Sequence, residues 1–215
     1  MSSLVLSALM VGLLQVRNEP AVPAQVIFQA DFEGVAAGSV PAGFTPVHGE
    51  FVVREHDNNK FLESPRAPVD EYTMTFGPSE AGNLSLVARV LGTAKGKRYP
   101  VFGIGLGGAS GYRLQVSPGK RVIELCKGDD RKATAPFEWI PGKWLWLKLE
   151  VTKVTEVKWR ARCKAWYDAE AEPVSWGLVV EEESPIRTGR AMLIAAPISG
   201  TPIRFDNLRI ERVVP

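Results

Sequence analysis

The chain has 215 residues, with 26 Lys and Arg against 24 Asp and Glu and a formal net charge of +2. This length is enough for one large domain with its own core, and all-β sandwiches of this size commonly stay undivided. The near balance of charge and the lack of a long basic run give no indication of electrostatic capture of nucleic acid, so we expect no nucleic-acid partner.

The chain begins with an apolar run from Leu4 to Leu14, followed by a polar stretch and the small-residue sequence Val22-Pro23-Ala24. This pattern predicts a signal peptide over residues 1–24, a mature domain over residues 25–215 and a secreted or periplasmic protein. Because no Lys or Arg precedes the run, an uncleaved anchor is the alternative. The run is shorter than the roughly 20 residues that span a bilayer, so we expect no membrane insertion of the mature chain.

About a dozen short alternating runs follow, separated by clusters of Gly, Pro, Asn and Asp. They are residues 25–33, 50–56, 60–64, 71–77, 83–92, 101–108, 112–117, 121–128, 144–151, 157–166, 176–182, 190–197 and 203–213. No stretch of ten or more residues has a convincing helical period. The pattern predicts an all-β, two-sheet antiparallel sandwich of the jelly-roll type, in which the concave outer face of one sheet forms a groove for an extended ligand.

Gly103, Gly105 and Gly108 match the bare spacing of a dinucleotide-binding loop. That loop requires a helix next, whereas the following residues, ASGYRLQV, are strand-like. We therefore predict that the glycines permit a bulge or close packing between strands. His48 and His56 have no partner at the spacing of a zinc or nucleophile site, so we expect surface histidines.

The stretch from Gly142 to Trp176 is the strongest indication of function, because it predicts two antiparallel strands joined by a short turn near residues 153–156. Residues two apart share a face, which divides each strand into two rows. The inward row is Leu145, Leu147, Leu149, Val151, Trp159, Ala161, Cys163 and Ala165. The outward row is Trp144, Trp146, Lys148, Glu150, Arg160, Arg162, Lys164 and Trp166. One face is therefore core, and the other carries tryptophans and charges together.

Sugar binding uses flat apolar rings to stack on sugar C–H groups, with polar side chains beside them to hold hydroxyls. The predicted binding residues are Trp146, Lys148, Glu150, Arg162, Lys164 and Trp166, joined by Arg113, Gln115 and Glu124. The alternative is structural, since opposite charges across a strand pair also stabilise ordinary sheets.

The only cysteines, Cys126 and Cys163, are permitted to form a disulfide in an exported protein. Cys163 falls in the inward row, whereas Cys126 has the parity of Glu124 and opposes Leu125. Geometry decides such a bond, and two separate thiols are the simpler expectation.

Several segments in order resemble the concanavalin A-like lectin/glucanase superfamily, and within it the laminin-G-like and 3-keto-disaccharide hydrolase-like (DUF1080-type) domains of exported bacterial proteins. These segments are DFEG, GYRLQVSPGKRVIELCKG, PGKWLWLKLEV, KAWYDAEAEPVSW and IRFDNLRIERV. The resemblance extends from Gln25 to the end of the chain. It implies a jelly roll and a polysaccharide or oligosaccharide partner, and we expect a monomer.

The same resemblance implies a structural Ca²⁺ site that joins the terminal strands, with Asp31 and Glu33 in the first strand and Asp206 beside Asn207 in the last. Carboxylate oxygens from neighbouring strands are suitable calcium ligands. The alternative is that these acids serve turns and solubility.

Asp168, Glu170 and Glu172 recur at two-residue spacing, like the acidic strand of the family's retaining glucanases. Pro173 follows directly, and this favours a turn over a central strand. Our leading hypothesis is an exported, non-catalytic carbohydrate-binding domain. The alternatives are a glycoside hydrolase or 3-keto-glycoside-cleaving enzyme that uses acids such as Glu124, Glu150 or Glu172, and a cell-surface protein-interaction module.

Overall fold

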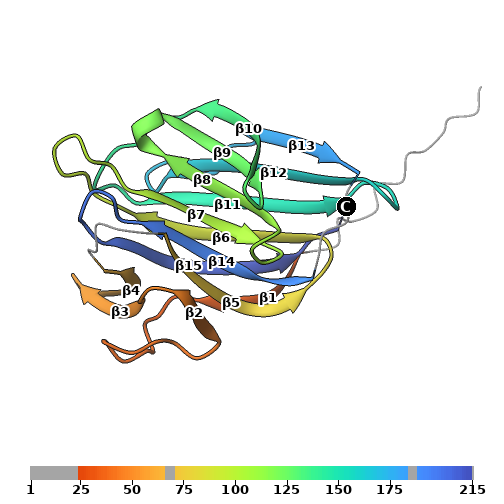
Figure 1. Ribbon diagram of the computed structural model, residues 1–215. Coiled ribbons are helices and arrows are strands. Elements are labelled where there is room, and N and C mark those ends of the chain that lie inside the picture. Colours follow the sequence, from red (N-terminus) through yellow and green to blue (C-terminus); the bar gives the residue numbers. More distant parts are fainter. Residues whose placement is uncertain (1–23, 66–70, 184–187, 215) are drawn as a thin grey trace, which may run out of the picture.

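The protein is a β-sandwich, described by a computed structural model over residues 24–65, 71–183 and 188–214. Fifteen strands and one short 3₁₀ helix form two antiparallel sheets that pack face to face (Figure 1). The all-β sandwich predicted from the sequence is thus confirmed. The predicted signal peptide lies outside the described residues apart from Ala24. In the described ranges, no helix is long and apolar enough to cross a membrane.

Sheet A has eight strands. They are β1 (Gln25–Ala30), β3 (Val52–His56), β4 (Asn59–Ser64), β6 (Leu84–Leu91), β11 (Leu145–Lys153), β12 (Trp159–Tyr167), β13 (Leu178–Glu182) and β15 (Ile203–Arg212). Their spatial order is β13-β12-β11-β6-β15-β4-β3, with β1 paired to β15 beside this path.

Sheet B has seven strands. They are β2 (Phe44–His48), β5 (Tyr72–Glu80), β7 (Val101–Leu106), β8 (Tyr112–Ser117), β9 (Val122–Lys127), β10 (Asp130–Pro136) and β14 (Gly189–Ala196). Their order is β10-β9-β8-β7-β14-β5-β2, and the 3₁₀ helix η1 (Pro118–Lys120) joins β8 to β9.

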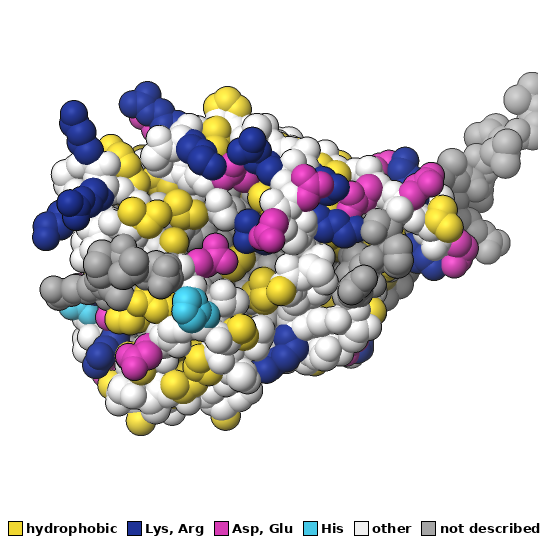
Figure 2. Space-filling view, in the orientation of Figure 1, with side chains coloured by type: hydrophobic (Ala, Val, Ile, Leu, Met, Phe, Trp, Pro, Cys, Tyr) yellow, Lys and Arg dark blue, Asp and Glu magenta, His cyan; other side chains and the backbone are white. Residues whose placement is uncertain are grey.

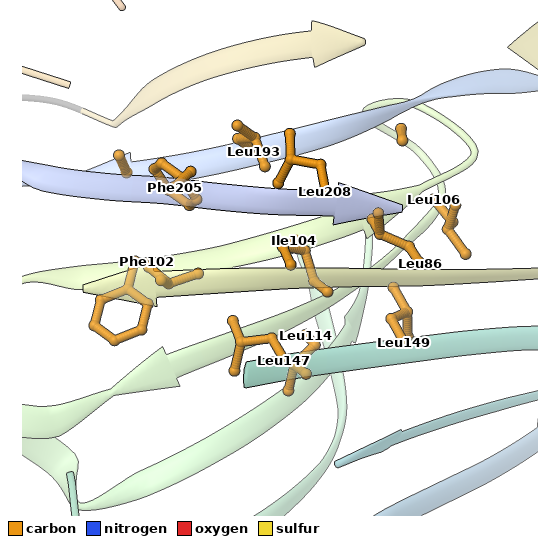
Figure 3. Close-up of a cluster of buried hydrophobic side chains, with 14 of the residues drawn as sticks. Leu86, Phe102, Ile104, Leu106, Leu114, Leu147, Leu149, Leu193, Phe205 and Leu208 are labelled. Carbon is orange, nitrogen blue, oxygen red and sulfur yellow. The ribbon is translucent and has the colours of Figure 1, made fainter. Parts of the chain in front are cut away.

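The core lies between the two sheets, where alternate residues of each strand meet. Leu86, Leu147 and Leu149 of sheet A face Ile104 and Leu114 of sheet B, and all five side chains are fully buried (Figure 3). Burial of apolar side chains from both layers is the dominant favourable term in folding such a sandwich. The alternating pattern of the sequence is what makes this two-layer burial available.

Two strands, β2 and β10, were not expected from the sequence. They are the two edge strands of sheet B and contain Pro46 and Pro136 respectively. Proline and charged residues such as Asp130 and Arg131 are typical of edge strands, because one side of an edge strand needs no ladder hydrogen bonds. Neither strand, FTPVH or DRKATAP, has the regular alternation of apolar and polar residues that identified the other strands.

Gly103 and Gly105 serve close packing of β7 against β8, as predicted, whereas Gly108 lies in the following turn with a φ of +69°. A Cβ at Gly103 would lie 2.3 Å from the carbonyl oxygen of Leu114, so only glycine lets β7 approach β8 this closely. The next element after these glycines is the strand β8 and not a helix, which contradicts a dinucleotide-binding loop. Both cysteines are buried and free, as the parity of Cys126 and Cys163 favoured.

Candidate functional site

The β11–β12 hairpin is antiparallel and has the facing that the sequence predicted. Trp146 pairs with Trp166, Lys148 with Lys164 and Glu150 with Arg162. The four inward residues of β11 are at most 1% exposed, and Ala161 and Cys163 of β12 are fully buried. The other row faces away from the core on the outer face of sheet A.

The segment between β12 and β13, residues 168–177, folds back over this outer face, and we refer to it as the strap. The Glu172 carboxylate lies 2.8 Å from the amino groups of both Lys148 and Lys164. The Trp176 ring lies 4.3 Å from the Arg162 guanidinium and 4.6 Å from the Lys164 ammonium, as cation–π contacts. The strap thus covers the β12 side of the face that the sequence predicted to be open to solvent.

The cover by the strap changes the exposure of three predicted site residues. Glu150, Lys164 and Trp166 point outward but are only 6%, 7% and 7% exposed. Because β12 ends at Tyr167, the acids of the sequence DAEAEP lie in the strap. The prediction that they form a turn and not a catalytic strand is confirmed for their secondary structure.

Trp146, which is half-buried, and Trp166, which is 7% exposed, lie beside the surface that the strap leaves open. Their rings stack with centroids 6.2 Å apart and planes inclined by 12°. The Trp146 indole nitrogen donates to Asp168 Oδ1 at 2.6 Å, and Arg89 Nε donates to the same oxygen at 3.1 Å. Arg89 also lies 4.4 Å from the Trp144 ring centroid. These contacts hold the tryptophan pair in one orientation.

A groove with a volume of about 570 Å³ lies beside the tryptophan pair. Val87 of β6, Trp146 and Trp166 line one part of it, and Asn207 and Arg209 of β15 line the other. Gln29 and Asp31 at the end of β1, together with Glu172 of the strap, complete the lining. The groove therefore combines aromatic rings, amides and charged groups on one surface.

The register of sheet A explains why these distant residues meet. Val87 pairs with Lys148 on one side and with Arg209 on the other, and Arg209 pairs with Gln29. The pairing of β15 with β6 shifts between Asp206 and Arg209. Asn207 lies in this irregularity with a left-handed φ of 50°. A bulge of this kind redirects side chains, and here it brings Asn207 to the groove.

Arg113, Gln115 and Glu124, which the sequence placed beside the tryptophans, belong to sheet B, so that prediction was wrong. They lie on β8 and β9, across the core from the hairpin. Gln115 and Ser117 donate to Glu124, at 3.1 and 2.5 Å. Burial raises the pKa of Glu124, but hydrogen bonds from Ser117, Arg131 and Lys120 outweigh it and lower the pKa. The alternation along a strand predicts which of its side chains face away from the core, but not to which of the two sheets the strand belongs.

The residues predicted to bind calcium are engaged with other groups. Asp206 is 1% exposed and accepts hydrogen bonds from Asn59 at 3.2 Å and from its neighbouring backbone N–H at 2.7 Å. The Arg89 guanidinium lies 3.5 Å from the same carboxylate. Glu33 accepts from the Lys60 backbone at 3.0 Å, and Asp31 from the Glu33 backbone at 3.2 Å.

Over the part of the chain that the structure describes, no three acidic, histidine or cysteine side chains form a group that could hold a metal ion. The Arg89 guanidinium already pairs with the Asp206 carboxylate. These residues therefore do not fit the predicted calcium site. His48 and His56 lie on the surface, as predicted, the first bonded to the Glu71 carbonyl and the second beside Asp57.

Most charged groups around the groove are paired, but Asp31, which is exposed, accepts a hydrogen bond from the Glu33 backbone and forms no ion pair with any described residue. Glu172 is paired with two lysines, Arg89 with Asp168 and Arg209 with Glu211. Burial raises the pKa of Glu172, but the hydrogen bonds from Lys148 and Lys164 outweigh it, so the pKa lies below its usual value. Glu150 is bonded to Arg162 at 2.7 Å. The groove is therefore polar, and among its described lining residues Asp31 is the one charge outside these ion pairs.

No family model matches the sequence, and no curated protein matches it. Among solved structures, the chain resembles the carbohydrate-binding module CBM66 from Bacillus subtilis, with a TM-score of 0.55 and 14% identity over 79% of this chain and 95% of that one. It also resembles the exoplasmic/lumenal domain of VIP36 in a Ca²⁺- and Man2-bound form, with a TM-score of 0.57 and 10% identity over 89% and 88% of the two chains.

A PL-14 alginate lyase from Aplysia kurodai is similar too, with a TM-score of 0.56 and 14% identity over 89% of this chain and all of that one. By contrast, the chain spans 38% of a xylan β-1,4-xylosidase from Bacillus halodurans and 19% of a sialidase. The shared feature is the jelly-roll sandwich, in agreement with the fold that the concanavalin A-like resemblance implied. At these identities the similarity defines the fold.

Proposed function

We propose that this domain binds a polysaccharide or oligosaccharide without cleaving it, in the groove on the outer face of sheet A. The observation that carries the proposal is the stacked Trp146–Trp166 pair at the wall of a groove of about 570 Å³. Aromatic surfaces of this kind stack on the C–H faces of sugar rings. The volume lies within the range of small-molecule sites, roughly 300–1,000 Å³.

The polar lining supplies the directional part of recognition. Gln29 and Asn207 offer amide donors and acceptors, and Arg209 and Glu172 offer charged groups that hold hydroxyls. Because Arg209 and the lysines beside Glu172 are already paired within the protein and Asp31 adds a negative charge, we propose a neutral sugar as the ligand of this groove. An acidic sugar would leave one charge without a partner.

The three acids that the sequence offered for catalysis favour binding over hydrolysis. A glycosidase needs one carboxyl group kept protonated as general acid, which requires a raised pKa. The pKa values of Glu172 and Glu124 are lowered, and Glu150 is held in an ion pair with Arg162. Glu124 also lies on the opposite sheet. None of these three acids has the environment of a general acid.

Two comparisons support the proposal: one similar structure is named as a carbohydrate-binding module, and another is described as bound to Man2. The second is also described as bound to Ca²⁺. We propose sugar binding without calcium, because Arg89 and Asn59 already engage Asp206. The predicted leader supports a secreted or periplasmic location as part of the proposal.

The test is a glycan array followed by calorimetry with the best ligand. We expect Trp146→Ala to weaken binding about 30-fold or more, since a central aromatic contact is worth about 2 kcal/mol. The double variant Gln29→Ala, Arg209→Ala changes only exposed side chains of the groove and keeps the fold testable. Arg54→Ala, exposed on β3 of the same sheet and outside the groove, is the matched control.

The proposal fails if the wild-type protein binds no glycan on the array. It also fails if the double variant binds the selected glycan as tightly as Arg54→Ala does. Release of a shortened sugar during calorimetry would contradict the non-catalytic part. Capture of a protein partner by the same face, with no glycan bound, would favour the interaction-module alternative.

A further inference from the structure

We infer that one end of the sandwich carries a second binding site, for an acidic polysaccharide bearing carboxylate or sulfate groups. This end carries six exposed basic side chains, which we call the basic end: Lys95, Lys97, Arg98, Lys120, Arg121 and Lys143. Figure 2 shows Lys and Arg side chains gathered at the left of the molecule, where Figure 1 has the β6–β7 loop. The inference does not rest on the function proposed for the groove.

Direct contacts bring the loops of the basic end together. The Gly142 backbone N–H donates to the Gly92 carbonyl at 2.8 Å, and the Phe137 N–H donates to the Arg121 carbonyl at 2.9 Å. The Tyr99 ring meets the Trp139 ring edge-on, with centroids 6.5 Å apart. The β6–β7, β8–β9 and β10–β11 loops are therefore one surface and not separate flexible tips.

The β6–β7 loop presents its cations in a fixed arrangement. The backbones of Lys95 and Arg98 exchange two hydrogen bonds of 3.1 Å across a two-residue turn. Gly96 takes the left-handed φ of +60° that this tight turn uses. The bridge holds Lys95 and Arg98 side by side and places Lys97 at the tip, so three cations occupy four consecutive positions.

The charge of the basic end is not balanced locally. Within the described ranges, five of its six cations take part in no ion pair, and the sixth, Lys120, pairs with the nearly buried Glu124. The exposed acid within the three loops is Glu138, on the β10–β11 loop. Since the chain as a whole has a net charge of only +2, this surface is a local concentration of positive charge. Such a surface raises the local concentration of an anionic ligand.

A hollow of about 350 Å³ opens beside these cations. It is lined by Thr93, Lys95, Thr201 and Arg204, among others. Thr201 donates to the Thr93 carbonyl at 2.8 Å, which fixes the wall. Arg204 stacks 4.5 Å from the Phe61 ring and pairs with Glu63 at 3.0 Å, so within the described ranges Lys95 is the lining cation without an ion pair. Hydroxyls and cations around a hollow suit a sugar ring with an anionic group.

The hollow is the reason to favour a glycan over other polyanions. A membrane surface would meet the projecting loops but would not enter the hollow. A nucleic acid would be expected to gain from stacked bases on exposed rings. Among the aromatic rings of these loops, Tyr99 is 38% exposed, Trp139 is 8% exposed, and Phe137 and Trp144 are half-buried. This end therefore offers more hydroxyl groups and charges than exposed aromatic rings to a ligand.

The test measures binding of polygalacturonate, which carries carboxylates, and dextran sulfate, with neutral dextran as comparator. The variant Lys95→Gln, Lys97→Gln, Arg98→Gln removes three exposed charges of the β6–β7 loop. We expect about tenfold weaker binding of the charged polymers, the combined effect of three lost exposed contacts. The matched control is Arg54→Gln, Lys153→Gln, Lys158→Gln, which removes the same charge elsewhere. Its residues form only surface ion pairs.

Salt provides a second measurement. Raising ionic strength from about 0.1 M to about 1 M shortens the Debye length from about 10 Å to about 3 Å, so wild-type binding should fall steeply. The loop variant should show a shallower dependence. The groove variant Gln29→Ala, Arg209→Ala should bind the charged polymers as the wild type does, whatever becomes of the sugar proposed for the groove.

Polygalacturonate binding alone assigns the site to carboxylated glycans, and dextran sulfate binding alone assigns it to sulfated ones. The inference is overturned if neither polymer binds at about 0.1 M salt, where charges within about 10 Å still interact. It is also overturned if the control variant weakens binding as much as the loop variant. Tighter loop-dependent binding of duplex DNA or anionic lipid vesicles would replace the glycan with that partner.

Discussion

Glu182 on β13 joins the two sheets at one edge of the sandwich, and we predict that its charge is a main source of acid-sensitive stability. Its carboxylate accepts a hydrogen bond from the buried Tyr112 hydroxyl at 2.5 Å. It also pairs with Lys127 at 2.6 Å and with Lys132 at 3.2 Å. Burial raises the pKa of Glu182, but these partners outweigh it and lower the pKa from 4.5 to about 2.

The size of the effect follows from this pKa. A lowering from 4.5 to about 2 corresponds to about 3 kcal/mol of folding free energy, at about 1.36 kcal/mol per pH unit. Because the folded pKa lies below the unfolded one, this contribution is present above 4.5 and is lost as the pH falls from 4.5 to about 2. Glu182→Gln should therefore cost about 3 kcal/mol at neutral pH and flatten the loss of stability in that acid range.

The assay is urea unfolding at neutral pH and at several acidic values, followed by tryptophan fluorescence. Glu181→Gln is the matched control, since Glu181 neighbours Glu182 but is paired with Lys158 and Arg160 at the surface. That variant should stay close to the wild type. Tyr112→Phe should cost about 1–2 kcal/mol for one lost hydrogen bond to a charged group. If Glu182→Gln unfolds within about 1 kcal/mol of the wild type at neutral pH, the reasoning about this carboxylate is wrong.

Three further predictions concern the core, the thiols and calcium. Leu149→Ala should lower the free energy of unfolding by about 3–5 kcal/mol in the same urea assay, because a fully buried leucine leaves a cavity between the sheets; a loss below about 1 kcal/mol would contradict this. Burial raises the pKa of the Cys163 thiol to about 12. A thiol-reactive dye at mildly alkaline pH should therefore label Cys163 only after unfolding, and labelling of Cys163 in the folded protein would refute this. A calcium chelator should leave both glycan binding and the melting temperature unchanged, and a lowered melting temperature would show that a cation binds despite Arg89.

The sequence predicted the hairpin well because strand parity is a local property. A period of two fixes which side chains of β11 and β12 share a face, and a burial requirement on one face fixes their register. The prediction placed Trp146 and Trp166 on one face, and the structure pairs them on it. The alternation does not tell to which sheet a strand belongs, and for this reason Arg113 and Gln115 were predicted beside the tryptophans although they lie in sheet B.

Exposure on the outer face could not be predicted in the same way. It depends on the path of the strap, which is set by Glu172 bonded to two lysines and by Trp176 stacked on Arg162 and Lys164. These contacts join the strap to β11 and β12, and each residue alone is compatible with a solvated loop. The proline after Glu172 correctly predicted the end of the strand, but not where the following residues go.

One feature of the sequence of β15 indicates the groove. Along β15 the buried apolar residues are Ile203 and Phe205, then Leu208 and Ile210. The spacing of two is broken by a step of three, which is the pattern of a bulge at Asp206 and Asn207. The structure has its irregular pairing and a left-handed Asn207 at this place.

Without that extra residue, Asn207 would keep the parity of Phe205 and face the core, where its amide would be buried without a designed partner. With it, Leu208 enters the core and Asn207 reaches the groove beside Arg209. The change of parity therefore has two effects: it buries Leu208 in the core, and it places Asn207 in the wall of the proposed sugar site. A search for such changes of parity in the strands next to an outward aromatic pair would have identified Asn207 and Arg209 from the sequence.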